Sequence, residues 1–269
     1  MPRDNIMHNI LDLYAQTNTP YIHALGRRGA AFLVHELAGA SGGNILEIGF
    51  GTGQTLVDIS AKWPLCTLYG VEISESMLTA ARKRMKFCGL QSIHLLRISP
   101  QHPLPFRDNF FDAVYAESAL AYLPGERLDV LMADIYRVLK KDAVFMCNES
   151  LWRTHISQHT MLEINEKCLR LFGIPQANVQ YPHAGNWVSL CAGTGFRLEK
   201  IQYLQELNTT IRNPQNLASH LSRLFTCAGR LKRRIHPALS RRYKAFQEAE
   251  REFEQYGLFL EGIFFKFRK

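Results

Sequence analysis

The chain has 269 residues, of which 46% are hydrophobic and 21% are charged, and this composition excludes a disordered or fibrous protein. Its formal net charge of +8 is concentrated in one segment, because residues 211–245 contain nine basic and no acidic residues while the rest of the chain contains 23 basic and 24 acidic ones. No apolar run is long enough to span a membrane or to form the core of a signal peptide, so we expect a cytoplasmic protein.

The front half of the chain has the pattern of repeated strand-helix units. A helical lead-in is expected over residues 1–40, followed by a core over 41–150 in which short apolar runs alternate with amphipathic stretches. The strands predicted in this core are 44–48, 68–73, 93–98, 111–116 and 143–147. The helices predicted between them are 53–61, 76–87 and 127–139, and Ser74 is expected to cap the second of these. The alternation predicts a parallel sheet with helices on both faces.

The rear half has a different pattern. Residues 151–195 and 207–256 are predicted to be mostly helical, with the first helix beginning at Leu151, and to cover the site. Two alternating segments, 196–206 and 257–267, predict strands that pair antiparallel at a sheet edge. No linker rich in Pro, Gly and Ser divides the chain. We therefore expect one domain over 1–269, with a seven-stranded, mostly parallel sheet whose last strand is antiparallel.

A glycine-rich turn, Glu47-Ile-Gly-Phe-Gly-Thr-Gly, joins the first predicted strand to the helix that follows it. Its glycines allow a tight turn and a close approach of the backbone to a ligand. A dinucleotide fingerprint would require glycine at position 54, where this chain has Gln54. The acidic Glu47 is poorly suited to a pyrophosphate and well suited to a cationic amine.

Glu72 ends the second predicted strand, where a carboxylate can accept both hydroxyl hydrogens of a ribose. An adenosine ligand with a cationic amino-acid tail would satisfy Glu47 and Glu72 together, and S-adenosyl-L-methionine is such a molecule. The product of its use would be S-adenosyl-L-homocysteine. The alternative interpretation is that the glycines are ordinary turn residues and that Glu72 is a solvated strand end.

Further motifs follow in the order Leu104-Pro-Phe-Arg-Asp-Asn-Phe-Phe-Asp-Ala-Val, Ala119-Leu-Ala-Tyr-Leu-Pro and Ile135-Tyr-Arg-Val-Leu-Lys. Together with the glycine turn and the acidic strand end, they make residues 40 to 150 resemble the class I S-adenosylmethionine-dependent methyltransferases. The resemblance is nearest to the type 11 group that includes ubiquinone, sterol and tocopherol methyltransferases. It implies a Rossmann-like fold and an S-adenosylmethionine-dependent enzyme.

The resemblance also implies which residues bind the cofactor. The methionine end would be held by Glu47, Gly49, Gly51 and Gly53, and Phe50 and Thr52 of the same turn would also bind the cofactor. Glu72 and Ile73 would hold the ribose and the adenine, and Glu117 would face the methyl group or the methionine tail. Where the family usually has an acidic residue for the adenine amine, this chain has Ser99 and Pro100. Ser99 offers one uncharged acceptor and Pro100 offers no amide donor, so the adenine contact is expected to be weaker.

Methyl transfer is an in-line displacement at an activated carbon, so positioning and desolvation can supply most of the rate. A general base is needed only for an acceptor that ionises poorly. The candidates for that base are His23, Glu117 and Tyr122, each of which could instead be a pocket wall. The run that begins at Tyr21 resembles a family segment that folds over the cofactor, which would place Tyr14, Tyr21 and His23 at the edge of the substrate pocket.

The acceptor is expected to be a small molecule methylated on an O, N or C atom. The D/N-P-P-Y and Pro-Cys motifs of nucleic-acid methyltransferases are absent. Aromatic residues in the rear half are consistent with an apolar or aromatic acceptor, namely Trp152, Phe172, Trp187, Phe225 and Phe246. The alternative is an RNA methyltransferase, or a non-catalytic module that binds S-adenosylmethionine or RNA through residues 211–245.

The basic segment 211–245 has three interpretations: a solvated face, a region that attracts an anionic substrate or an anionic lipid surface, and a site for RNA phosphates. We favour a small-molecule partner with at most a peripheral lipid contact and without nucleic acid, and the oligomeric state stays open. His155 and His159 could bind a metal from one helix face, but no third ligand is evident. The six cysteines contain no C-x-x-C pair. We predict no metal site.

Overall fold

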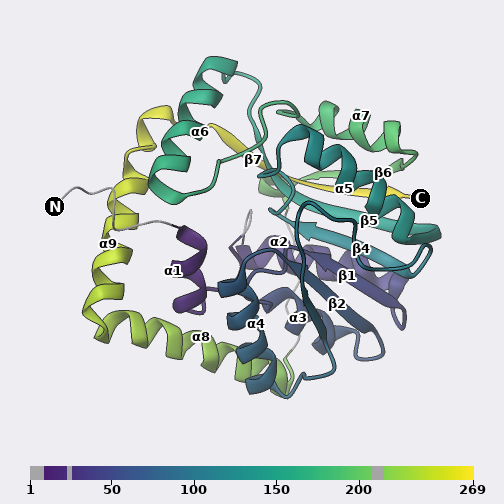
Figure 1. Cartoon of the computed structure of the whole chain (residues 1–269), viewed down its shortest axis with the longest axis horizontal. Helices are drawn as coiled ribbons and strands as arrows, with labels where there is room; N and C mark the ends of the chain where they lie inside the picture. The colour runs from purple at the N-terminus through teal and green to yellow at the C-terminus, as the bar shows by residue number, and fades with distance from the viewer. Residues whose placement is uncertain (1–8, 23–25, 208–214) are drawn as a thin grey trace.

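The computed structural model describes residues 9–22, 26–207 and 215–269. Its centre is a seven-stranded sheet with the order β3-β2-β1-β4-β5-β7-β6 (Figure 1). The strands are β1 (Asn44–Ile48), β2 (Thr67–Glu72), β3 (His94–Arg97), β4 (Phe111–Glu117), β5 (Leu139–Trp152), β6 (Arg197–Tyr203) and β7 (Leu260–Arg268). The first five run parallel, whereas β7 is antiparallel to both β5 and β6. The predicted Rossmann-like sheet is confirmed.

Helices cover both faces of this sheet, because the central strands have apolar side chains on both sides. On β5, Phe145 and Cys147 pack with α5 (Gly125–Val138) and α7 (Ala184–Thr194). The alternate residues of β5 pack on the other face. That face is covered by α2 (Gly26–Glu36), the 3-10 turn η2 (Leu37–Ala40), α3 (Gln54–Lys62) and α4 (Glu75–Cys88).

A second group of helices lies beside the sheet, at the left and bottom of Figure 1. It consists of α1 (Ile10–Gln16), α6 (Gln158–Phe172), α8 (Leu217–Ile235) and α9 (Pro237–Arg251), with the 3-10 turns η3 (Leu204–Glu206) and η4 (Glu254–Tyr256) preceding α8 and following α9. Helices α1, α6 and α9 share an apolar cluster of their own, and α8 packs on α3 and α4. No helix in the described ranges is long and apolar enough to cross a membrane.

Local signals explain most helix starts. The hydroxyl of Ser74 accepts a hydrogen bond from the amide of Met77 at 3.3 Å, so the predicted cap of α4 is present. The predicted helix start at Leu151 is wrong, because β5 continues through Trp152 and pairs with β7. Both Leu151 and Trp152 are buried, and α6 begins only after Ser157, whose hydroxyl caps it.

One buried guanidinium joins the two groups of helices. Arg84 on α4 is fully buried and donates hydrogen bonds to the carbonyl oxygens of Thr52 and Asn18 and to side-chain oxygens of Gln54, Ser222 and Thr226. Burial lowers its pKa to about 10, so it stays protonated at neutral pH. Arg84 therefore fixes α8 against the residues that begin α3.

Candidate functional site

The turn between β1 and α3 can be formed only by glycines. Gly49, Gly51 and Gly53 have φ values of +73°, +53° and +76°, in the left-handed region that disfavours other residues. A Cβ on Gly49 would lie 2.5 Å from the Cβ of Ala119, and one on Gly53 would lie 2.7 Å from the Cε of Met85. The backbone of this turn is consequently held close to the ends of β1 and β4.

Glu72 fixes the turn to the end of β2. One of its carboxylate oxygens accepts the amide of Gly51 at 3.0 Å, and the other accepts the amides of Ile73 at 2.8 Å and Ser74 at 2.9 Å. Burial raises the pKa of Glu72, and the three amides partly oppose that shift. Each carboxylate oxygen has two lone pairs, so acceptor capacity for a ligand hydroxyl remains. The apolar Ile73 beside it is 48% exposed.

Two further carboxylates lie at the same edge of the sheet. Glu47 on β1 is buried and accepts a hydrogen bond from the hydroxyl of Tyr115 at 2.7 Å, and Glu117 on β4 accepts one from Thr55 at 3.0 Å. Burial raises the pKa of Glu47 well above its usual range, and the negative charge of Glu117 raises it further. A cation bound here would relieve both effects.

Asn148 on β5 lies next to Glu117 across the sheet. It is fully buried, and neither polar atom of its side chain has a hydrogen-bond partner within the described residues. Buried amides normally have partners, so this one indicates a polar ligand at the edge of the sheet. Together with the acidic residues and the glycine turn, it fits a molecule that carries an ammonium group and a ribose.

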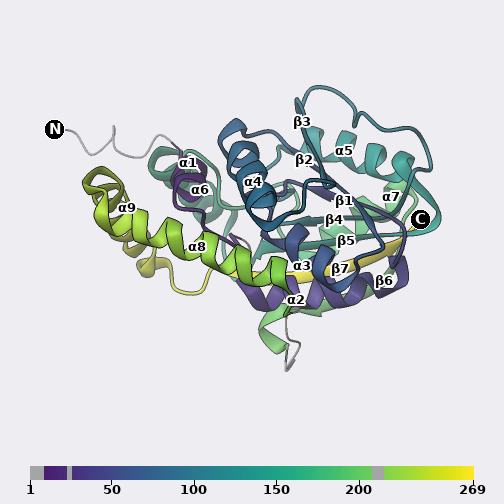
Figure 2. The same cartoon turned by 90° about the horizontal axis from the view of Figure 1, so that it is seen from below.

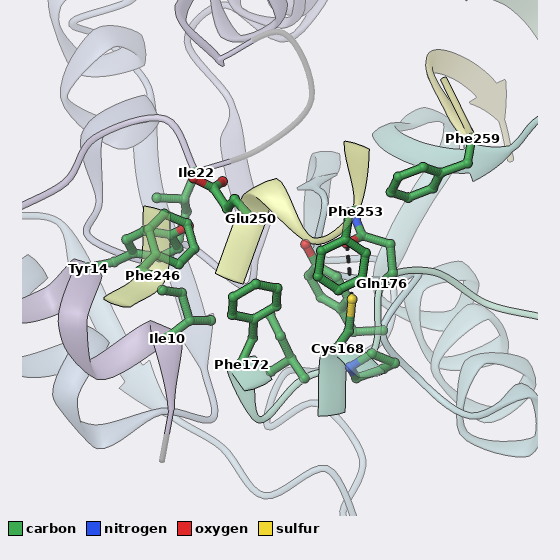
Figure 3. A pocket seen from close by; sticks show the side chains of 13 residues that line it. Ile10, Tyr14, Ile22, Cys168, Phe172, Gln176, Phe246, Glu250, Phe253 and Phe259 are labelled. Atoms are coloured by element: carbon green, nitrogen blue, oxygen red, sulfur yellow. Dashed lines mark hydrogen bonds between the residues drawn. The ribbon is translucent and has the colours of Figure 1, made fainter. Parts of the chain in front are cut away.

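A cavity of about 340 Å³ lies beside the glycine turn (Figure 3). Ile22 connects the two, since it lines the cavity and its Cδ1 lies 3.3 Å from the position of a Cβ on Gly51. The walls come from α1, α6, α9 and the segments next to them, and are formed by Ile10, Tyr14, Ile22, Tyr122, Cys168, Phe172, Ile174, Pro175, Gln176, Phe246, Glu250, Phe253 and Phe259. Most of these side chains are apolar or aromatic, so the cavity suits an apolar guest.

The structure brings most of the predicted cofactor residues together. Those of the glycine turn, with Glu72, Ile73 and Glu117, meet where β1, β2 and β4 end. Phe50 is buried against Gly70, where a Cβ would lie 2.5 Å from its ring. The hydroxyl of Thr52 donates to the carbonyl oxygen of Thr19 at 2.8 Å, which holds the lead-in over the turn.

Ser99 and Pro100 lie in an exposed turn after β3, next to the end of β2, where the amide of Ile98 donates to the carbonyl oxygen of Glu72 at 3.0 Å. The hydroxyl of Ser99 accepts the amide of Gln101 at 3.3 Å, and the carbonyl oxygen of Pro100 accepts a hydrogen bond from Arg127 at 2.9 Å. The hydrogen bond from Arg127 therefore connects this turn to α5. A contact between Ser99 and the adenine stays a prediction.

The candidate bases have different positions. Tyr122 lines the cavity, Glu117 lies at the end of β4, and His23 falls outside the described residues. Tyr14 lines the cavity as expected. Tyr21 does not line this cavity, and its hydroxyl donates a hydrogen bond to Asp58 on α3 at 2.6 Å.

The aromatic residues of the rear half separate into two sets. Phe172 and Phe246 line the cavity, but Trp152, Trp187 and Phe225 do not. Trp152 donates its ring N–H to the carbonyl oxygen of Asn178, Trp187 packs under α5, and Phe225 lies under the guanidinium of Arg84. Aromatic residues at helical spacing do not by themselves distinguish a core from a pocket. In the described ranges, no group of three or more His, Cys, Asp and Glu could hold a metal ion.

One buried acid is absent from the sequence-based predictions. Glu149 on β5 is fully buried and accepts the amides of Ala119, Leu120 and Ala121 at 3.1 to 3.2 Å. It thereby fixes the loop after β4, which leads to Tyr122. Burial raises its pKa to about 7. The signal in the sequence is weak: an acidic residue two positions after the predicted strand 143–147.

Comparisons with known proteins agree with this geometry. Residues 45–142 match the protein-family model described as a methyltransferase domain. A solved structure from Galdieria sulphuraria, described as a candidate sarcosine dimethylglycine methyltransferase, shares the fold with a TM-score of 0.70 and 17% identity, over 97% of this chain and 98% of that one. The domain match, the shared fold and the sequence relatives support a class I S-adenosylmethionine-dependent methyltransferase with S-adenosyl-L-methionine as its cofactor.

Two proteins are similar to this chain in sequence. A protein of unassigned function from Haemophilus influenzae is 26% identical over 198 residues, which is 73% of this chain and 74% of that protein. A demethylmenaquinone methyltransferase from Symbiobacterium thermophilum is 35% identical over 113 residues, which is 40% of this chain and 43% of that protein. The stronger identity therefore covers less than half of either chain.

Proposed function

We propose that the enzyme methylates an O, N or C atom of a small apolar or aromatic molecule held in the 340 Å³ cavity. The observation that carries this proposal is the position of that cavity, whose largely apolar and aromatic wall includes Ile22 beside the glycine turn. The quinone-type substrate named for the Symbiobacterium relative is of the same class. Helices α1, α6, α8 and α9 would act as the substrate cover.

The predicted cofactor residues would divide the ligand between them. The backbone of the glycine turn and the carboxylate of Glu47 would hold the methionine end, Glu72 would accept a ribose hydroxyl on the oxygen that also accepts the Gly51 amide, and Ile73 would cover the adenine. Glu117 would lie nearest to the methyl group. Ser99 would be the adenine partner from the turn after β3, and Pro100 would shape that turn.

When bound, S-adenosyl-L-methionine supplies a methyl group on a sulfonium, which requires no nucleophile from the protein. The chain's own residues would position the acceptor and exclude water from it. Burial and the nearby Glu149 raise the pKa of Tyr122 far above its usual range, so its hydroxyl stays protonated at neutral pH. We therefore assign Tyr122 the role of a hydrogen-bond donor to the acceptor, and not that of a base.

We also propose that α8 rests on an anionic lipid surface from which an apolar acceptor could be taken. Leu217, Leu224, Leu231 and Ile235 are 58% to 74% exposed, and their spacing places them along one outward stripe of α8. Lys232, Arg223 and Arg234 flank this stripe. An apolar stripe flanked by basic residues is typical of helices that lie in a membrane interface. Figure 1 shows α8 at the bottom of the molecule, and Figure 2, seen from below, shows this helix on the side toward the viewer.

The proposed activity can be tested by transfer of labelled methyl groups from the cofactor to a cell extract, which is then separated into small-molecule, lipid and RNA fractions. We expect label in the first two fractions, and we expect Phe172→Ala in the cavity wall to reduce it at least tenfold. Leu169→Ala, on the exposed side of the same helix, is the matched control and should transfer normally. Calorimetry with the cofactor should show equal binding by both variants, which verifies their folding.

Label found only in RNA, or equal transfer by Phe172→Ala and the intact enzyme, would contradict the proposal. Absence of label from every fraction, with the cofactor still bound, would favour a non-catalytic binding module.

A further inference from the structure

A second cavity of about 660 Å³ adjoins the first. The two have Tyr14, Phe246 and Glu250 in common, and Figure 3 shows these three side chains near one another at one end of the apolar cavity. The two cavities are therefore adjacent and meet at these three side chains. The walls of the two cavities differ in character, because the second is rich in arginine.

Four guanidinium groups line the second cavity. Arg27 comes from α2, and Arg230, Arg233 and Arg234 come from α8. None of the four forms an ion pair with a carboxylate within residues 9–22, 26–207 and 215–269. Arg233 is held in place by the ring of Tyr243 on α9, with 3.8 Å between the guanidinium carbon and the ring centre.

Among the described residues that line this cavity, Glu250 alone has a carboxylate. Burial raises its pKa, which weakens its opposition to a bound anion. Thr19, Tyr21 and Thr226 also line this cavity. Asp58, which is hydrogen-bonded to Tyr21, lies close enough to Arg27 to interact with its charge. Four arginines therefore outnumber the carboxylates in and near this cavity, and the concave space has an excess of positive charge. Guanidinium groups bind phosphate oxygens in bidentate fashion.

We infer that the second cavity binds a phosphate or diphosphate group of the acceptor, so that the substrate is an amphiphile with its apolar part in the first cavity and its anionic head among Arg27, Arg230, Arg233 and Arg234. This inference rests on the proposed function, since it takes the guest of the first cavity to be the acceptor. It adds a substrate class to that function.

Direct binding of decyl phosphate and decanol to the full chain, without the cofactor, tests the inference. Decyl phosphate should bind at least tenfold more tightly than either decanol or inorganic phosphate. Arg230→Gln combined with Arg233→Gln should weaken binding of decyl phosphate at least tenfold and leave decanol binding unchanged. Arg241→Gln, an exposed position on α9 outside this cavity, is the matched control and should bind decyl phosphate normally.

Three results would overturn the inference: equal binding of decyl phosphate and decanol, equal binding of decyl phosphate and inorganic phosphate, or no effect of the double substitution. Tighter binding of single-stranded RNA than of decyl phosphate, with a steep dependence on salt, would instead identify a nucleic-acid site. Unfolding midpoints of the variants verify that they fold. Because no methyl transfer is measured, a failure here is distinguishable from a failure of the extract experiment.

Discussion

At the scale of single residues, buried polar groups hold the site together. Arg84 joins α4, α8 and the end of the glycine turn, and Glu149 holds the three amides of the loop after β4. Both side chains are fully buried, and neither pairs with an opposite charge within the described part of the chain. Their hydrogen bonds go to fixed neighbours, so they determine where the ligand-facing segments lie.

The ionisation of Glu149 should make stability depend on pH. Its pKa is raised from 4.5 to about 7 in the folded chain, so the folded state holds this proton more tightly than the unfolded state. The stabilisation is fully present below about pH 4.5 and is lost as the pH rises through 7, a decrease of roughly 3 kcal/mol in the free energy of unfolding. Glu149→Gln should remove this part of the decrease, as measured by denaturant unfolding between pH 4.5 and 8.

The control is Glu166→Gln, which replaces an exposed carboxylate on α6. Its free energy of unfolding should decrease with pH by as much as that of the unchanged chain. If Glu149→Gln kept the full decrease, the ionisation of Glu149 would not be its source.

The residues of the glycine turn and Glu72 could be found in the sequence because their signal is local. They directly follow or end an apolar strand in the sequence, so their place at a strand end can be predicted without knowing the rest of the fold. Glu149, Phe253 and Phe259 could not be found in this way. Their roles depend on which distant segments they meet, and a buried acid or an aromatic residue has the same local pattern in a core and in a pocket.

At the scale of elements, apolar runs predicted all seven strands to within a few residues except for the length of β5. The extension of β5 to Trp152 depends on pairing with β7, which comes more than a hundred residues later. The helices of the cover were predicted only as helical segments. Their arrangement depends on close contacts, such as that between Gly229 on α8 and the carbonyl oxygen of Thr17 after α1.

Gly229→Ala should destabilise the fold although alanine favours helices. An added Cβ would lie 2.1 Å from the carbonyl oxygen of Thr17, so α8 must move away from the lead-in. We expect a loss of about 1–3 kcal/mol in the free energy of unfolding, measured by chemical denaturation. The matched control is Gly193→Ala on α7, where a Cβ would meet nothing within 4 Å. That change should stabilise by up to about 1 kcal/mol, and equal effects of the two substitutions would show that the contact with Thr17 is unimportant.

At the scale of the whole molecule, charge and apolar surface are distributed unevenly. The sheet and its helices have almost no net charge, and the basic excess lies in residues 211–245, most of them in α8 and α9. The basic residues of α8 are distributed over two surfaces. Arg230 and Arg233 line the second cavity, Arg223 and Lys232 border the exposed apolar stripe, and Arg234 belongs to both. Net charge alone would have suggested nucleic acid.

Vesicles that contain anionic phospholipid should bind the protein through the stripe on α8. Leu224→Ser combined with Leu231→Ser should weaken binding about tenfold, because each leucine contributes apolar area to the interface. High salt should weaken it further by screening the basic residues. Co-sedimentation measures both effects. Leu65→Ser, at an exposed leucine far from α8 in the chain, is the control, and binding that is equal for neutral vesicles or for all variants would rule out this surface.

The placement of β7 has a consequence for how the family could diversify. Strands β6 and β7 are hydrogen-bonded neighbours, so the segment that contains α8 and α9 leaves the sheet and returns to it at adjacent positions. Such a segment can be replaced by another of different length or sequence, because the sheet constrains only the two points where the segment leaves β6 and enters β7. Evolution could therefore change the molecule that is methylated, or the surface on which the enzyme works, while the glycine turn and its carboxylates stay as they are.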